Sequence, residues 1–231
     1  MPVVADILKA IDRRFAIKSI LKGEPWGGFD LRGEKELEWS WVISNLPPPP
    51  KRCLDIGCCY SPITPTMVAM GNTVTGVDLE ELPYRLNGLT FIRGDFNSLE
   101  LPEASFDVVV LCSVVEHIGL AGRFGVKESD PDGDLKAMRK VKRLLADGGV
   151  LLLTIPVGED WVFHPWHRVY GCSRLPLLLD GWTEIRSRFF TKQPDGPWNE
   201  AAREQALSYP KCPRRYALGQ FVLTPRAPEK P

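Results

Sequence analysis

Residues able to do chemistry gather first around a glycine that follows a short apolar run. In "RCLDIGCCYS" (52–61) the run ends at Gly57, and two cysteines come directly after it. A second apolar run, "TVTGVDL" (73–79), leads to Asp78. A glycine between a strand and a helix lets the backbone approach a ligand closely, and a carboxylate can accept hydrogen bonds from both hydroxyls of a ribose. The spacing therefore predicts a site for a nucleotide-like ligand at the ends of two strands.

The residues that follow Gly57 argue against a dinucleotide. A G-x-G-x-x-G turn needs its second and third glycines where this chain has Cys59 and Pro62. Pro62 also lacks the amide that a phosphate needs at a helix start. S-adenosylmethionine carries no phosphate, so this objection does not apply to it. For its adenine, Asp95 can accept a hydrogen bond from the amino group, beside Phe96 for the ring face.

Histidines offer the candidate proton acceptors. His117 follows Glu116 just past an apolar run, and His164 and His167 lie in "GEDWVFHPWHRVYG" (158–171). Each could act as a general base because the pKa of histidine lies near neutrality, and each could instead serve packing. Arg168 could pair with an anionic group of a substrate or form a surface salt bridge.

Cysteine spacing gives little support for a metal site. The six cysteines are scattered, and Cys58 and Cys59 are adjacent, without the CxxC partners that are typical of zinc sites. We predict no bound metal and expect several cysteines to act as small buried hydrophobes. The first twenty residues lack the long apolar core of a signal peptide, and no apolar window is long enough to span a membrane. These features predict a cytoplasmic, reducing location.

Strands must place these residues, and the apolar runs predict seven of them. Continuous runs such as "VVVL" (108–111) indicate burial on both faces, hence a parallel sheet with helices on each side. The fold class expected is α/β, a doubly wound, Rossmann-like and mostly parallel sheet, closed by an antiparallel C-terminal strand pair. The runs are 52–57, 73–79, 89–95, 106–114, 150–158, 182–190 and 216–225. The segment 132–149 has the apolar spacing of an amphipathic helix that ends at Gly148 and Gly149.

Helical patterns before residue 51 predict an N-terminal cap. Residues 3–22 and "GEKELEWSWVISNL" (33–46) have helical spacing, and four prolines, 47–50, form a stiff spacer after them. We divide the chain into a cap and spacer at 1–50, a main domain at 51–225 and a disordered tail at 226–231. Trp39 and Trp41 are candidates for a lid over the site.

Five motifs in order resemble those of the class I S-adenosylmethionine-dependent methyltransferases: "CLDIGCCYS", "VTGVDL", "FIRGDF", "FDVVVLCSVVEHIG" and "KRLLADGGVLLLTIPVG". More narrowly, the region from "GRFGVKESD" to "HRVYGCSRLPLLLDGW" looks like a methyltransferase-like family of unknown function. The resemblance implies S-adenosyl-L-methionine as cofactor. It also implies cofactor-binding residues at the motif positions: Asp55, Gly57, Cys58, Cys59, Tyr60, Asp78, Leu79, Asp95, Phe96, Cys112 and Ser113. In this family Asp55 would chiefly order the glycine turn, and direct contact with the cofactor is the alternative.

This chain departs from the family pattern at two kinds of position. Cys59 and Ser61 replace later glycines of the first motif, which predicts a narrowed pocket and leaves open a non-catalytic binding or scaffold protein. Some quinone O-methyltransferases of this fold hold a divalent ion with a Glu-His pair and an acid four residues earlier, where this chain has Cys112. The signature that holds planar amino groups is also missing, which argues against adenine, cytosine and glutamine methylation.

Charge bears on the acceptor of the methyl group. The chain has 29 basic and 29 acidic residues, so no net positive field gathers nucleic acid or anionic membrane. We expect an enzyme that methylates a small-molecule or glycan-like acceptor at oxygen, using His117, His164 or His167 where a base is needed. A protein or RNA acceptor is the alternative, and the oligomeric state stays open.

Overall fold

The computed structural model describes residues 34–122, 124–192, 196–212 and 215–227. The predicted helix at 3–22 and the end of the tail lie outside these residues. The proposed boundaries of the cap and the main domain stay predictions.

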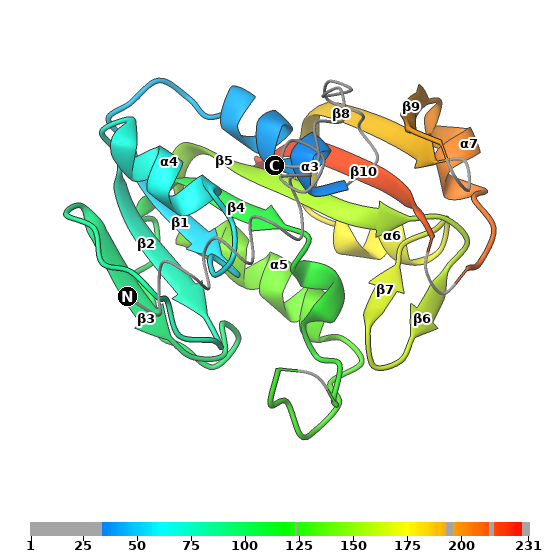
Figure 1. Cartoon of the computed structure of the whole chain (residues 1–231), viewed down its shortest axis with the longest axis horizontal. Helices are drawn as coiled ribbons and strands as arrows, with labels where there is room; N and C mark the ends of the chain where they lie inside the picture. The colour runs from blue at the N-terminus through cyan, green and yellow to red at the C-terminus, as the bar shows by residue number, and fades with distance from the viewer. Residues whose placement is uncertain (1–33, 123, 193–195, 213–214, 228–231) are drawn as a thin grey trace, which may run out of the picture.

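A single mixed sheet forms the centre of the described chain (Figure 1). Its strand order is β3-β2-β1-β4-β5-β10-β8-β9. The first five strands of this order run parallel to one another, and the last three pairings are antiparallel. The strands are β1 (Arg52–Ile56), β2 (Thr73–Asp78), β3 (Leu89–Arg93), β4 (Phe106–Cys112), β5 (Leu145–Val157), β8 (Trp182–Lys192), β9 (Trp198–Ala201) and β10 (Ala217–Pro225). This confirms the predicted Rossmann-like fold with an antiparallel C-terminal pair. The order reverses between β1 and β4, where α/β sheets bind ligands.

One strand of the main sheet was not predicted. β9 is only four residues long, and its sequence, "WNEA", has one buried side chain, that of Trp198. Such a short edge strand leaves no apolar run to detect. The helix predicted at 132–149 also ends earlier, because β5 begins directly after it at Leu145.

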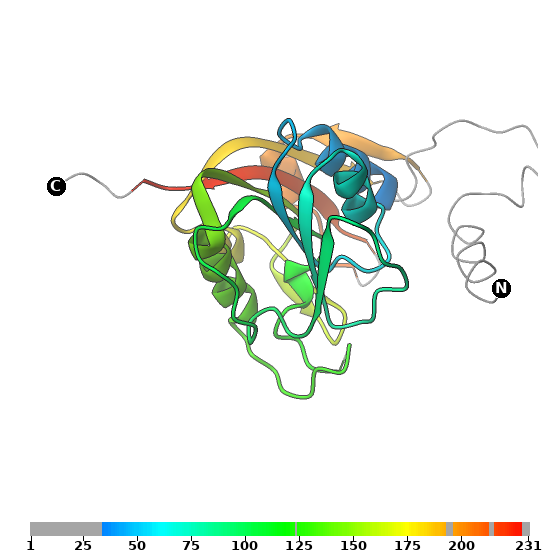
Figure 2. The ribbon, with the colours of Figure 1, turned by 90° about the vertical axis from the view of Figure 1, so that its left-hand side faces the viewer.

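Helices cover both faces of the parallel strands, as Figure 2 shows. Along β4, Val108 and Val110 join a core cluster with Met67, while Val109 and Leu111 face a second cluster on the opposite side. This alternation follows from the period of two in a strand. One face carries α3 (Glu34–Ser44) and α4 (Ile63–Ala69), and the other carries α5 (Gly133–Leu144).

Smaller elements complete the described chain. They are the 3₁₀ turn η1 (Val115–His117), the hairpin β6 (Trp161–Phe163) with β7 (His167–Val169), and the short helices α6 (Arg174–Leu178) and α7 (Arg203–Leu207). The aromatic segment 158–171 thus contains the β6–β7 hairpin. None of the described helices is long and apolar enough to cross a membrane.

Candidate functional site

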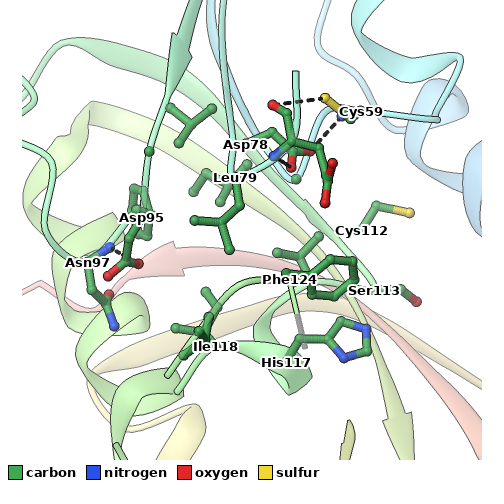
Figure 3. Close-up of a pocket in the computed structure, with 18 of the residues that line it drawn as sticks. Cys59, Asp78, Leu79, Asp95, Asn97, Cys112, Ser113, His117, Ile118 and Phe124 are labelled. Carbon is green, nitrogen blue, oxygen red and sulfur yellow. Dashed lines mark hydrogen bonds between the residues drawn. The ribbon is translucent and has the colours of Figure 1, made fainter. Parts of the chain in front are cut away.

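A cavity of about 470 Å³ lies at the carboxyl ends of the parallel strands (Figure 3). This volume is in the range of small-molecule and cofactor sites. Ten of the predicted site residues line it: Gly57, Cys59, Tyr60, Asp78, Leu79, Asp95, Phe96, Cys112, Ser113 and His117. The sequence motifs therefore converge on one hollow, although they come from four separate strand ends.

The turn after β1 depends on Gly57. Its φ is +76°, and its amide donates a hydrogen bond to the Val77 carbonyl at 2.7 Å. A Cβ at this position would lie 2.3 Å from Cγ2 of Val114, so only glycine fits. Tyr60, also with a positive φ of 65°, lines the cavity with a side chain that is 74% exposed. The turn therefore brings open backbone close to whatever fills the cavity.

Asp78 joins this turn to the end of β2. Its carboxylate accepts the Cys59 amide at 2.8 Å through Oδ2 and the Glu80 amide at 3.0 Å through Oδ1. Figure 3 shows this carboxylate and Cys59 together at one side of the cavity. Each carboxylate oxygen has two lone pairs, so both keep capacity for a further hydrogen bond. The geometry suits a pair of neighbouring hydroxyls.

The side chains of Asp55 and Cys58 lie behind the turn instead of along the cavity. Asp55 is 1% exposed and accepts the Thr64 hydroxyl of α4 at 2.6 Å. Burial raises the pKa of this carboxyl to about 7. Cys58 is fully buried and fills the space beside Gly76. Both side chains therefore support the turn from its rear, and neither lines the cavity.

The loop after β3 forms the far end of the cavity. Asp95 accepts the Asn97 amide at 3.1 Å and the Ser98 hydroxyl at 2.9 Å, which is the turn-capping role. It also lines the cavity together with Phe96, whose buried ring lies 4.8 Å from the Lys140 ammonium. Asp95 thus caps the turn and also lines the cavity, and its predicted contact with adenine stays a prediction.

Helix α3 contributes a polar network that sequence reasoning missed. The fully buried carboxylate of Glu38 accepts hydrogen bonds from the hydroxyls of Ser113 and, at 2.7 Å, Thr154. Its other oxygen lies 3.0 Å from the Lys35 ammonium. Burial opposes the charge of Lys35, but Glu38 outweighs it and raises the pKa of this lysine above its usual range. In the sequence, Lys35 and Glu38 have the spacing of an ion pair on one helix. No neighbouring residue indicates that Glu38 contacts the sheet.

The two tryptophans of α3 have different positions. Trp39 lines the cavity, and its role as a lid stays a prediction. Trp41 is 5% exposed and belongs to the core cluster under the helix. The prediction of Trp41 as a lid residue is wrong, because it lies two positions further along the helix and faces the sheet.

His117 is the histidine that lines the cavity. Its Nδ1 is hydrogen-bonded to the Trp166 carbonyl of the hairpin, and its Nε2 lies 3.7 Å from Oε1 of the buried Glu116. His164 and His167 lie in the hairpin, outside the set of lining residues. The His167 ring contacts the rings of Phe163 and Tyr216, with centroids 5.8 and 5.3 Å away. Residues of α3 and η1 thus line the cavity, whereas residues of the aromatic hairpin do not.

Arg168 has a role that differs from both predicted alternatives. It is 2% exposed, so it is no surface salt bridge, and it does not line the cavity. Its guanidinium donates to the carbonyls of Glu116, Ile118, Asp130 and Pro131 and lies 3.8 Å from the buried Asp134. Arg168 therefore holds both ends of the loop 118–131, which forms part of the cavity wall.

Comparisons with known proteins identify a matching family and several similar proteins. Residues 84–210, more than half of the chain, match the family described as "Caenorhabditis protein of unknown function, DUF268". A ubiquinone biosynthesis O-methyltransferase of Pseudomonas fluorescens is 29% identical over 179 residues, covering 72% of this chain and 69% of that protein. A Pseudomonas aeruginosa protein of the same name is 26% identical over 204 residues and covers 80% of each chain.

Solved structures show the same fold at low identity. The N-methyltransferase NodS of Bradyrhizobium japonicum, in complex with S-adenosylhomocysteine, superposes with a TM-score of 0.57 at 18% identity, covering 88% of this chain and 92% of that one. The 1,6-didemethyltoxoflavin-N1-methyltransferase of Burkholderia thailandensis gives a TM-score of 0.54 at 18% identity, covering 96% and 90%. The chain belongs to the DUF268 family and has the class I S-adenosylmethionine-dependent methyltransferase fold.

Proposed function

We propose that this S-adenosylmethionine-dependent methyltransferase transfers a methyl group to an oxygen of a small-molecule or glycan-like acceptor. The observation that carries the cofactor assignment is the pairing of Gly57 with Asp78. A glycine that tolerates no Cβ sits beside a carboxylate whose oxygens face the same cavity. Asp78 would hold the ribose hydroxyls, and Asp95 with Phe96 would hold the adenine.

Electrostatics at the cavity favour a cationic ligand. Among the described lining residues, five are carboxylates, namely Asp78, Glu80, Asp95, Glu128 and Asp130, and Lys35 is the cation. Clustered charge of one sign in a cleft raises the local concentration of ligands of the opposite sign. When bound, S-adenosylmethionine supplies a methyl group activated by the positive charge on sulfur.

His117 is the residue best placed to take a proton from an acceptor hydroxyl. Because Nδ1 faces a carbonyl, this nitrogen carries the proton and Nε2 is left to accept one. The carboxylate of Glu116, 3.7 Å away, would stabilise the imidazolium that results. His164 and His167 do not line the cavity, so either could act as the general base only for an acceptor that binds outside it, against the hairpin.

An oxygen acceptor is favoured over the alternatives by three observations. The sequence relatives named above are O-methyltransferases by name. The chain lacks the signature that holds planar amino groups. Its zero net charge gives no general attraction for RNA. The structural neighbours include N-methyltransferases, so a nitrogen of a small molecule is the nearest alternative.

Calorimetric titration with S-adenosylmethionine and S-adenosylhomocysteine tests the cofactor assignment. We expect saturable binding of one molecule per chain, weakened at least about tenfold by Asp78→Asn, since hydrogen bonds to charged groups contribute about 1.5–3 kcal/mol each. Glu103→Gln, at an exposed surface ion pair, is the matched control and should bind as the wild type does. Absence of saturable binding to folded protein would favour the non-catalytic alternative.

Transfer of tritiated methyl groups into a fractionated cell extract tests the acceptor. We expect label in the small-molecule or glycan fraction. Label confined to ribonuclease-sensitive material or to precipitated protein would refute this part of the proposal.

A further inference from the structure

The structure brings together three potential metal ligands that the sequence keeps apart. The Cys58 and Cys59 thiols and a carboxylate oxygen of Asp78 all lie within 4.8 Å of one another. Adjacent cysteines alone gave no metal signal, because the third group comes from the end of β2, twenty residues after Cys58. We propose that these three side chains form a binding site for a thiophilic divalent cation such as Zn²⁺ or Cd²⁺, at the rear of the cofactor turn.

The spacing fits such an ion with small side-chain movements. A tetrahedral zinc with Zn–S bonds of about 2.3 Å places its two sulfurs about 3.8 Å apart. The two thiols are already in hydrogen-bonding contact, and together with burial this contact raises the pKa of the Cys58 thiol. An ion that replaces the thiol protons would release them to solvent. Two sulfurs and one oxygen leave a fourth position for water.

Charge and access support a cation at this place. The carboxyl of Asp55 lies behind the turn and adds to the negative potential at Cys58. Cys59 and Asp78 line the cavity, so an ion can reach the buried Cys58 from there. Cys59 otherwise directs its thiol only to the Glu80 carbonyl, at 3.8 Å, and this weak bond is a small loss on metal binding. The two sulfur ligands select soft ions over Mg²⁺ or Ca²⁺.

The site shares Asp78 with the proposed ribose contact, so metal and cofactor should exclude each other. This antagonism rests on the proposed function, whereas metal binding itself does not. At a metal concentration ten times its Kd, the apparent affinity for S-adenosylhomocysteine should fall about tenfold by mass action.

Titration of the full reduced chain with CdCl₂, free of other thiols, tests the metal site. We expect one Cd²⁺ per chain with thiolate-to-cadmium absorption in the ultraviolet, and no binding of Mg²⁺. Cys59→Ser should weaken Cd²⁺ binding by more than the 10- to 100-fold that loss of an outer partner costs, and Cys58→Ser should do the same. Cys172→Ser, at an exposed cysteine elsewhere, is the matched control and should keep full binding.

Two results would overturn the proposal: no Cd²⁺ bound at micromolar concentration, or Cd²⁺ binding by Cys59→Ser that is as tight as that of the wild type. Circular dichroism of each variant shows whether a loss of Cd²⁺ binding comes from the missing thiol or from unfolding. Cys59→Ala removes the same cavity-lining thiol and repeats the test. S-adenosylhomocysteine binding measured in EDTA tests the cofactor assignment alone. If the nucleotide binds there and Cd²⁺ does not weaken it, the shared use of Asp78 is refuted while the methyltransferase assignment stands.

Discussion

The wall of the cavity that holds Gly57 and Asp78 and the wall that holds Ser113 and His117 face the same space but draw on different parts of the chain. The first wall is built from a turn and the strand ends next to it, joined by backbone hydrogen bonds. The second depends on buried charges from distant segments, Glu38 before the first strand of the sheet and Arg168 between β5 and β8. The first wall is thus built from neighbouring strand ends, whereas the second wall is assembled by contacts between distant segments.

Arg168→Met should have the largest effect, because it removes the buried cation that organises the second wall. We expect a loss of about 3–5 kcal/mol in the free energy of unfolding, since the Asp134 charge loses one partner and several carbonyls lose their donor. Urea unfolding measures it. Arg188→Met, which breaks the exposed pair with Glu200, should change the midpoint little. Equal midpoints for the two variants would show that the second wall does not depend on Arg168.

Gly57→Ala should be the strongest single change in the first wall. Backbone strain at φ +76° and the clash with Val114 together predict a loss of about 3 kcal/mol in the free energy of unfolding. Gly148→Ala is the matched control, because Gly148 has a φ of +75° and no atom within 4 Å of an added Cβ. It should lose only the strain, about 1 kcal/mol. If both variants lose the same amount, the contact with Val114 is not what requires glycine.

Glu38→Gln tests whether the two walls of the cavity act independently. It removes the charge that balances Lys35, which predicts a loss of about 1–3 kcal/mol in unfolding free energy. The affinity for S-adenosylhomocysteine should change less than about twofold, since Glu38 is buried and does not line the cavity that Asp78 lines. Calorimetric titration of Glu38→Gln and Asp78→Asn with S-adenosylhomocysteine measures the two affinities. An affinity loss as large as that of Asp78→Asn would mean that the walls are not independent.

Asp55→Asn should have the smallest effect of the four substitutions, a change in how the free energy of unfolding depends on pH. Burial raises the pKa of Asp55 in the folded chain to about 7, above its ordinary value of 3.8. The folded state then binds more protons than the unfolded state between these values, so this group stabilises the fold below pH 4 and loses that contribution as the pH rises to about 7. Unfolding of both proteins from pH 4.5 to 7.5 should show stability falling more steeply with pH for the wild type. Parallel curves would contradict the raised pKa.

Much of the fold and the first wall could be predicted because local rules govern them. The central strands are buried on both faces and are therefore apolar runs. Seven of the eight strands of the main sheet were predicted from such runs or from strand-like residues, but the polar β9 was not. A turn that rejects a Cβ must be glycine, which marked Gly57. The second wall could not be predicted, since the sequence alone does not say that Arg168 is buried or that Trp41 faces the sheet while Trp39 faces the cavity. The rings of the aromatic residues around His167 contact one another and Tyr216, the residue before β10, and the sequence does not show these partners.

By itself the sequence determined most strands and helices along the chain, the glycine turn and the carboxylates at the strand ends, because each is set by the burial or backbone conformation of a few consecutive residues. Only the tertiary structure decided which distant groups meet: Glu38 with Ser113, Arg168 with the loop 118–131, and Asp78 with the paired thiols. A buried charge or donor is stable beside whatever partner the fold supplies, and that choice leaves no pattern in the neighbouring sequence.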